Sequence, residues 1–427
     1  MKKSYRLDNN AKYYPAVTKK SNSCVFRISA ILTEQVDSNV LWQAASIIIK
    51  RFPTMAVKLK KGLFWVYFYE NDNPLVVQEE SNHPCAPIMG IKENNDYLFK
   101  IMYFERRITL ECFHALTDGM GAMEFLKTLV YQYLLLTGKD VQDEGLIMLP
   151  QSIPEQQEEE DGYLRYYQKG VKGSRSKLKK SSKARLIKGT VLKEGRMNVI
   201  HGVIPAAPLA DYARLHGTTI TGYLVTVFAQ AIASCDSQLS QSHRPVRIGI
   251  PVNLRGMFPT KTMRNFVYQT SVSLPEDSRL TFDERLESVR TQMKTAITKE
   301  HLSERINTFV GYEKMIAGRI FPWFIKKVAI DIAAKWSEGA ITALLTNLGN
   351  IRLPKSMERY VDIMEAVPSQ KKGASINCGV CSVNGKLNIA FSTNIVETVI
   401  IRRFFDMVSE QTGLEVGIYS NDRMETR

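Results

Sequence analysis

His114 is the residue of this sequence whose type and position point most directly to chemistry. It follows the strand-like residues 108–113 and precedes Asp118 and Gly119, where a long apolar helical pattern begins. A histidine can take and return a proton near neutral pH, and on a turn at a strand end its ring can face a cleft. A plainer interpretation stays open, in which His114 is a packed turn residue and Asp118 only caps the helix.

Other patterns for catalytic or metal chemistry are weaker. Cys378 and Cys381 form a Cys-x-x-Cys, but a zinc site needs two further ligands at matching spacing, and none is evident. Their segment also has the pattern of a strand, in which residues three apart point to opposite faces. We therefore expect neither a metal site nor a redox site. The sequence contains no complete dinucleotide fingerprint, Walker loop, Gly-x-Ser-x-Gly elbow or His-Glu-x-x-His pair.

Strand and helix patterns place His114 in the first of two halves of mixed secondary structure. In the first half we expect a strand at 24–32, a helix at 39–51, paired strands within 55–69, two strands leading into His114, and a helix at 119–136. In the second half we expect strands at 197–204, 246–252 and 266–274, helices over much of 282–340, a hairpin of 376–382 and 387–392, and a final helix that includes 401–407. The hairpin turns at Asn384-Gly385, a strong two-residue turn signal. The mixture predicts an α+β or α/β fold with mixed sheets.

Length and charge predict two domains joined by a basic segment. A chain of 427 residues exceeds the size at which one core keeps growing. We assign residues 1–160 to the first domain, 161–196 to a linker or exposed loop, and 197–427 to the second domain. Residues 165–196 contain twelve Lys or Arg and one acid, so they carry +11 of the net charge of +14. Because the excess is local and the segment is rich in Ser and Gly, we expect a solvated connector and not a nucleic-acid-binding module.

Cysteine use and hydropathy predict a cytoplasmic protein. The six cysteines are scattered, which is typical of a reduced protein without a disulfide framework. The first ten residues have lysines but no apolar stretch behind them, so no signal peptide is expected. No window reaches the roughly 18 uncharged apolar residues of a membrane span. The most apolar region, 316–345, is interrupted by charges at helical spacing and predicts amphipathic helices.

The motif at His114 resembles the active-site motif of the CoA-dependent acyltransferase superfamily, His-x-x-x-Asp-Gly between a strand and a helix. That group includes chloramphenicol acetyltransferase, the plant BAHD acyltransferases, peptide-synthetase condensation domains and alcohol acetyltransferases. Other segments resemble those of the family, in the family's order, along nearly the whole chain: Val36-Asp37 with the helix closed by Arg51-Phe52-Pro53, residues 209–220, residues 250–255 and residues 346–349. The alcohol acetyltransferase-like subgroup is the most similar.

The resemblance implies a two-lobed fold of the chloramphenicol acetyltransferase type, with the active site in a tunnel between the lobes. His114 takes the family's catalytic role of general base. Asp118 belongs to the same catalytic motif, but in the family this aspartate points away from the substrate and pairs with an arginine. Arg255 is the candidate partner here, and an exposed loop charge is its plainer interpretation.

The resemblance also suggests residues that contact the substrate. Gly119 and Gly121 would keep the tunnel open at the start of the helix. Thr346 and Asn347 resemble the segment that lines the tunnel, and either could donate a hydrogen bond to the carbonyl oxygen as it gains charge. A simple turn at residues 347–349 is the alternative.

Two departures from the family pattern narrow the resemblance. Many relatives carry two adjacent histidines, and here the first of them is Phe113, although the histidine with the catalytic role is kept. An Asp-Phe-Gly-Trp-Gly near the C-terminus is absent, which argues against the BAHD branch.

The basic segment 165–196 has three possible functions besides that of a connector. It could be a clamp for CoA phosphates, a dock for a carrier protein, or a contact for an anionic membrane surface.

The implied activity is acyl transfer from acyl-CoA to a hydroxyl acceptor, with an amine or a thiol as further options. His114 would act as base and then protonate the leaving thiolate, without an acyl-enzyme. Acyl-CoA is then a co-substrate, no bound cofactor or metal is implied, and the partners are acyl-CoA and a small-molecule acceptor. We expect a monomer. Two alternatives stay open: a condensation-type domain with a carrier-bound donor, and a non-catalytic binding protein of the same fold.

Overall fold

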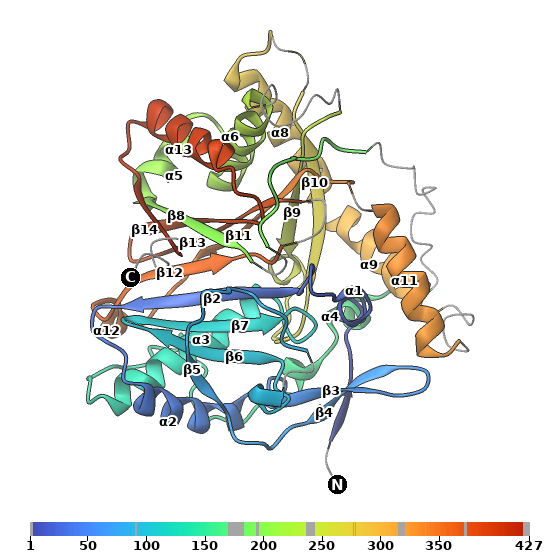
Figure 1. The fold of residues 1–427 in the computed structure, drawn as a ribbon, viewed down its shortest axis with the longest axis vertical. Helices are drawn as coiled ribbons and strands as arrows, with labels where there is room; N and C mark the ends of the chain where they lie inside the picture. The colour runs from blue at the N-terminus through green and yellow to red at the C-terminus, as the bar shows by residue number, and fades with distance from the viewer. Residues whose placement is uncertain are drawn as a thin grey trace.

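Two lobes lie one above the other in the computed structural model, and helices cover the side of each sheet that faces away from the other lobe (Figure 1). The structure describes residues 3–89, 92–169, 183–193, 196–235, 244–275, 277, 279–314, 321–337, 339–370 and 374–421. The predicted mixed α/β, two-lobed fold class is confirmed.

The first lobe is built on a five-stranded sheet. Its strands, in spatial order, are β12 (Val361–Val367), β2 (Val25–Leu32), β7 (Arg107–Phe113), β6 (Phe99–Phe104) and β5 (Val77–Glu79). Neighbouring strands are antiparallel except β5 and β6. Helices α2 (Ser38–Ile48) and α3 (Gly119–Leu136) pack against each other, and α3 contacts β2 and β7. The strand that ends next to His114 is therefore central in its sheet and held on both edges.

The second lobe is built on a seven-stranded sheet. Its strands, in spatial order, are β10 (Val267–Ser273), β9 (Arg247–Asn253), β11 (Ala343–Asn350), β13 (Ile376–Val383), β14 (Lys386–Thr393), β8 (Asn198–Pro205) and β15 (Gly417–Ser420). Four helices pack with this sheet: α5 (Ala206–Leu215), α6 (Ile220–Ser234), α8 (Phe282–Ala296) and α13 (Val399–Thr412). The predicted hairpin turn is confirmed, because Asn384 and Gly385 both have positive φ between β13 and β14.

Strand β12 ties the lobes together. It comes from the second half of the sequence but pairs antiparallel with β2 in the first lobe's sheet. It also packs against β13 and β14 of the second lobe. Strands β12 and β13 are so close that a Cβ on Gly379 of β13 would lie 1.9 Å from the carbonyl oxygen of Ala366 in β12. Glycine is required there because any side chain would separate the two sheets.

Smaller elements flank the two lobes. A three-stranded sheet has the order β1 (Ser4–Arg6), β4 (Val66–Glu70) and β3 (Val57–Lys61). Among the described residues the other elements are α1 (Tyr14–Val17), α4 (Gly162–Tyr166), α9 (Lys299–Lys314), α11 (Trp323–Ser337), α12 (Lys355–Glu358) and the 3-10 turns η1 (Ile49–Arg51), η2 (Lys92–Asn94), η3 (Gln156–Glu159) and η4 (Leu254–Gly256). Helix α1 contacts α11, and α4 contacts α9.

The predicted elements agree with the structure except at some boundaries. The helix expected at 39–51 ends as an α-helix at Ile48 and finishes as the 3-10 turn η1. The final helix runs from Val399 to Thr412 and includes the predicted residues 401–407, and it ends at the cap Gly413. Part of the basic segment, residues 170–182 and 194–195, lies outside the described residues. Within the described part of the chain, no helix is long and apolar enough to cross a membrane.

Candidate active site

His114 lies on the turn between β7 and α3, as the sequence predicts. Its backbone N–H donates to the carbonyl oxygen of Cys24, just before β2, at 2.8 Å. The imidazole ring is partly exposed. It stacks on Tyr14 of α1, with ring centroids 4.6 Å apart and planes 6° apart, and Phe26 of β2 lies 4.9 Å away on a tilted plane. These contacts fix the plane of the imidazole.

Asn265 determines which imidazole nitrogen carries the proton. The Oδ1 atom of Asn265 lies 3.1 Å from Nδ1 of His114. The Nδ2 atom donates to the carbonyl oxygen of His114 at 3.0 Å, so the amide cannot turn round without losing that bond. Because Oδ1 only accepts, Nδ1 must be the donor, and the lone pair of the neutral ring is on Nε2. The histidine is thereby held in the tautomer whose Nε2 can act as a base.

Asp8 lies next to the side-chain amide of Asn265. It is fully buried, and its Oδ1 accepts from the backbone N–H of Ala11 at 2.7 Å. Its Oδ2 lies 3.4 Å from Nδ2 of Asn265. Burial, with a smaller contribution from the charge of Asp161, raises the pKa of the Asp8 carboxyl to about 7. A carboxyl that titrates near neutral pH is therefore linked to His114 through one amide side chain.

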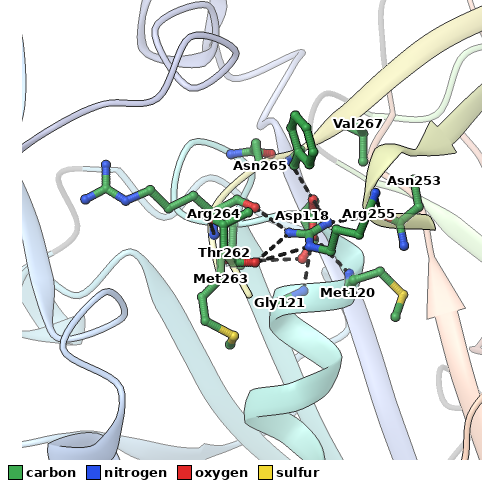
Figure 2. Close-up of polar contacts among 12 residues, drawn as sticks. Asp118, Met120, Gly121, Asn253, Arg255, Thr262, Met263, Arg264, Asn265 and Val267 are labelled. Atoms are coloured by element: carbon green, nitrogen blue, oxygen red, sulfur yellow. Dashed lines mark hydrogen bonds and ion pairs between the residues drawn. The ribbon is translucent and has the colours of Figure 1, made fainter. Parts of the chain in front are cut away.

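Asp118 makes the contact that the sequence predicts with Arg255 (Figure 2). Its Oδ2 accepts from Nη1 of Arg255 at 2.8 Å and from the backbone N–H of Phe266 at 2.8 Å. Its Oδ1 accepts from the backbone N–H groups of Met120 and Gly121 and so caps α3. Both oxygens are therefore engaged by the protein, and this geometry gives Asp118 a positioning role.

Arg255 extends this contact into the second lobe. Its guanidinium also donates to the carbonyl oxygens of Thr262 and Arg264, and Nη1 donates to Oδ1 of Asn253. The side chain thus holds the loop from η4 to β10 against the start of α3 (Figure 2). Asn265 lies in this loop, so the same clamp sets the position of the amide that contacts His114.

The glycines of the motif allow close packing at the start of α3. A Cβ on Gly121 would lie 2.4 Å from the carbonyl oxygen of Met263 and 2.2 Å from Oγ1 of Thr117. A Cβ on Gly119 would lie 2.7 Å from a methyl group of Leu348. Gly121 therefore faces backbone of the second lobe, and Gly119 faces a side chain of β11. Contact of either glycine with a substrate stays a prediction.

Thr346 and Asn347 lie on β11, two residues and one residue, respectively, before Leu348, which meets Gly119. Asn347 donates from Nδ2 to Oγ1 of Thr221 at 3.0 Å and accepts at Oδ1 from the backbone N–H of Gly349 at 2.7 Å. Residues 347–349 lie within β11, whose pairing with β13 shifts register between Asn347 and Asn350, and Gly349 has φ +78° there. The segment thus reaches the helix start through Leu348. Donation by Thr346 or Asn347 to a substrate stays a prediction.

The two cysteines of the Cys-x-x-Cys point to opposite faces of β13, as predicted. Cys378 packs in the core of the second lobe, and Cys381 packs in the core that includes the first lobe. Burial raises the pKa of both thiols. Among the residues that the structure describes, no three His, Cys, Asp or Glu side chains form a group that could hold a metal ion.

A small cavity lies between the lobes, away from the predicted site residues, and most of the residues that line it are polar or charged. Its volume is about 30 Å³, so it can hold a water molecule or two but not an acyl chain. Its lining includes Arg27, Arg107, His201, Glu365 and Tyr419. Beside the cavity, Arg27 forms ion pairs with Glu80 and Glu111, with nitrogen–oxygen distances of 3.0 and 2.8 Å. This network pairs the buried charges at the lobe interface with one another. The cavity is not at His114, so the tunnel expected there stays a prediction.

No protein family model matches the sequence, and no curated protein sequence matches it. Solved structures do match. The chain is similar to polyketide synthase associated protein 5 from Mycobacterium tuberculosis, with a TM-score of 0.62, 12% identity, and coverage of 95% of this chain and 97% of that one. It is similar to the epimerization domain from the third module of tyrocidine synthetase B, with a TM-score of 0.64, 10% identity and 96% coverage of both chains.

Two further structures broaden the comparison. The first condensation domain of the CDA synthetase matches with a TM-score of 0.60, 12% identity and 96% coverage of both chains. A wax ester synthase/diacylglycerol acyltransferase from Marinobacter aquaeolei VT8 matches with a TM-score of 0.55, 12% identity, and coverage of 96% of this chain and 98% of that one. The chain has the condensation-domain fold. At these identities the likeness establishes the fold, and the reaction has to be argued from the site.

Sequence reasoning missed three residues around His114: Tyr14, Phe26 and Asn265. None belongs to a recognisable motif, and Asn265 is 151 residues from His114 in the chain. The sequence contained one indirect signal, since a polar Asn directly precedes the apolar start of a predicted strand. Only the packing of the two lobes shows what that amide contacts.

Proposed function

We propose that this protein is an acyltransferase that moves an acyl group from acyl-CoA to a hydroxyl acceptor, in the manner of alcohol acetyltransferases. The observation that carries the proposal is the geometry of His114. Its ring plane is fixed by Tyr14 and its Nδ1 is bound to the amide oxygen of Asn265. The fold, shared with condensation domains and with a wax ester synthase, supports the same class of reaction.

In the proposed mechanism Nε2 of His114 accepts the proton of the acceptor hydroxyl as its oxygen attacks the thioester carbonyl. The resulting imidazolium is stabilised by Oδ1 of Asn265 and by the face of the Tyr14 ring. As the tetrahedral intermediate collapses, the C–S bond breaks and Nε2 returns the proton to the departing thiolate. One group acts first as base and then as acid, so no acyl-enzyme is required.

Thr346 and Asn347 are the proposed donors to the carbonyl oxygen as it gains charge. Their strand meets the start of α3 through Leu348 and Gly119, which supports this role. Acyl-CoA and a small-molecule acceptor are the proposed partners, and the molecule is proposed to act as a monomer without a bound cofactor. A donor bound to a carrier protein is the alternative within the same chemistry.

A thiol-release assay tests the proposal. The protein is given acyl-CoAs of several chain lengths with a panel of alcohols and amines, and in a second arm the same acyl groups bound to a carrier protein. We expect thiol release from acyl-CoA that depends on an alcohol. His114→Ala should lower turnover by about two orders of magnitude or more while the protein stays folded.

His83→Ala is the matched control, because His83 is exposed in a loop of the first lobe. The control should keep wild-type turnover. Near wild-type turnover in His114→Ala would show that His114 is not the base. If thiol is released only from donors bound to a carrier protein, the acyl donor is the carrier-bound acyl group and not acyl-CoA.

A further inference from the structure

Two exposed apolar segments meet on one side of the molecule. The first is the tip of the β3–β4 hairpin, where Leu63 is 68% exposed and Phe64 and Trp65 are also exposed. The second is helix α11, where Phe324 is 65% and Val328 is 58% exposed. Large apolar side chains so exposed are ordinary one at a time, but a contiguous group marks an interaction site.

Direct contacts join the two segments into one surface. The backbone N–H of Trp323 donates to the carbonyl oxygen of Leu63 at 2.8 Å. Lys326 donates from Nζ to the carbonyl oxygen of Phe64 at 2.9 Å and lies over the ring of Trp65. Figure 1 shows the hairpin and α11 on the same side of the molecule, beside α1. We call this surface the apolar face; it consists of Leu63, Phe64, Trp65, Phe321, Phe324, Ile325, Val328 and Ile332.

Helix α11 is apolar on two opposite sides. Trp323, Ile330 and Ala334 pack inward against the core. Residues 325, 328 and 332 follow the spacing of a single stripe on α11, and all three are exposed and apolar. A helix of a globular protein normally exposes a polar side opposite its buried apolar side, and an exposed apolar group marks an interaction site. The outward stripe of α11 therefore requires a second environment that the described chain does not supply.

The charges around the apolar face are positive. Residues 19–20, 58–65 and 321–335 contain eight lysines and one acid, Asp331. That acid is bound by Lys19 and Lys335. Lys61 and Lys327 are exposed beside the apolar side chains. Aromatic and aliphatic side chains surrounded by lysines match the boundary between lipid headgroups and acyl chains when the headgroups are anionic.

We propose that the apolar face docks on a lipid bilayer that contains anionic lipids, with α11 lying in the plane of the headgroups. The apolar stripe enters the acyl boundary while the lysines contact lipid phosphates. A bilayer fits better than a protein partner, because the exposed side chains belong to a helix and a hairpin tip and the charges around them are predominantly positive. The inference does not depend on the proposed reaction, since binding is measured without substrate.

The position of the apolar face connects it with the candidate active site. Helix α11 contacts α1, and Tyr14 of α1 stacks on His114. A bilayer at this face would therefore lie one short helix away from the histidine.

Vesicle co-sedimentation tests the proposal. Vesicles of phosphatidylcholine alone are compared with vesicles that also contain phosphatidylglycerol. We expect the full-length protein to bind the anionic vesicles more tightly, and binding to weaken as salt rises. The double variant Phe324→Ser, Val328→Ser should need at least about tenfold more lipid for half-maximal binding.

Two control variants separate this face from other causes. Ile153→Ser with Leu215→Ser removes two apolar side chains that are each 86% exposed elsewhere, and it should bind like the wild type. Changing Lys177, Lys179, Lys180 and Lys183 together to Gln tests the basic segment and should preserve the effect of Phe324 and Val328. Circular dichroism checks that each variant is folded.

Three results would overturn the proposal. The first is that the wild type does not bind anionic vesicles, and the second is that the wild type and the Phe324, Val328 variant bind them equally. The third is that the wild type binds no vesicles but self-associates in sedimentation velocity, and that the Phe324, Val328 variant does not self-associate. The last result would assign the face to a second copy of the chain.

Discussion

A single amide sets the chemical state of His114. Asn265 accepts from Nδ1 and donates to the histidine's own carbonyl oxygen, so the ring has one tautomer and one orientation. A similar amide contact and ring stacking occur at His201, whose Nδ1 lies 3.2 Å from Oδ1 of Asn388 and whose ring stacks on Tyr419. His201, however, is buried at the lobe interface, and burial lowers its pKa. Partial exposure at the end of β7 therefore distinguishes His114 as the candidate base.

Removal of this amide should change the pH profile as well as the rate. In Asn265→Ala the imidazolium loses its acceptor, so the pKa of His114 should fall and the acidic limb of kcat/KM should move to lower pH. Loss of one hydrogen bond to a charged group should lower kcat about tenfold. Asn388→Ala serves as the control and should leave the profile in place. An unchanged profile in a folded Asn265→Ala protein would limit Asn265 to a structural role.

Asp8 should make stability depend on pH. Its pKa is near 3.8 in the unfolded chain and about 7 in the folded protein. Between these values the folded protein keeps a proton that the unfolded chain has lost, so stability falls as the pH rises through this window. Asp8→Asn removes this effect. In urea unfolding, the free energy of unfolding of the variant should equal that of the wild type near pH 4 and exceed it near pH 8. Equal free energies at both pH values would mean that folding does not raise the pKa of Asp8.

At the scale of elements, the start of α3 is a second point, besides β12, where the two lobes are joined. The carboxylate of Asp118 caps the helix with one oxygen and binds Arg255 and the start of β10 with the other. The absence of a side chain at Gly121 lets the carbonyl oxygen of Met263 approach. Because His114 precedes this helix and Asn265 lies in the bound loop, the helix start positions both residues.

A double-mutant cycle tests this contact. Asp118→Ala and Arg255→Ala should each lower stability and activity, since each leaves a partly or fully buried charge without its partner. The double variant should cost less than the sum of the two, with a coupling of at least roughly 0.5 kcal/mol. Additive free energies of unfolding would contradict a direct interaction in solution.

At the scale of the whole molecule, the net charge is concentrated in one segment. Residues 165–196 carry +11 of +14, and much of that segment lies outside the described residues. We predict that it is a solvated connector. Lys177, Lys179, Lys180 and Lys183 changed together to Gln should leave the KM for acyl-CoA nearly unchanged.

A clamp for CoA phosphates predicts the opposite result. The KM would then rise about tenfold, equivalent to about 1.4 kcal/mol, and raised salt would have the same effect on the wild type. A dock for a carrier protein would make turnover sensitive to salt only with carrier-bound donors.

The sequence by itself determined the local parts of this protein. Alternating and helical patterns located the strand before His114 and the helix after it. Turn chemistry located the hairpin at Asn384-Gly385, and the pleat of a strand separated Cys378 from Cys381. Each of these depends on residues within a few positions of one another, so backbone geometry and periodicity suffice. The partner of Asp118 came from the resemblance and not from any local pattern.

The tertiary structure decided what meets across the lobes and what remains at the surface. It placed Asn265 against His114, put β12 into the first lobe's sheet, and left the outward stripe of α11 exposed. A polar residue before a strand has the same local pattern whether it faces water or a histidine from a distant part of the chain. An apolar stripe likewise has the same periodicity whether it is covered or not. Burial and distant contacts arise only when segments more than a hundred residues apart pack together, which no local pattern contains.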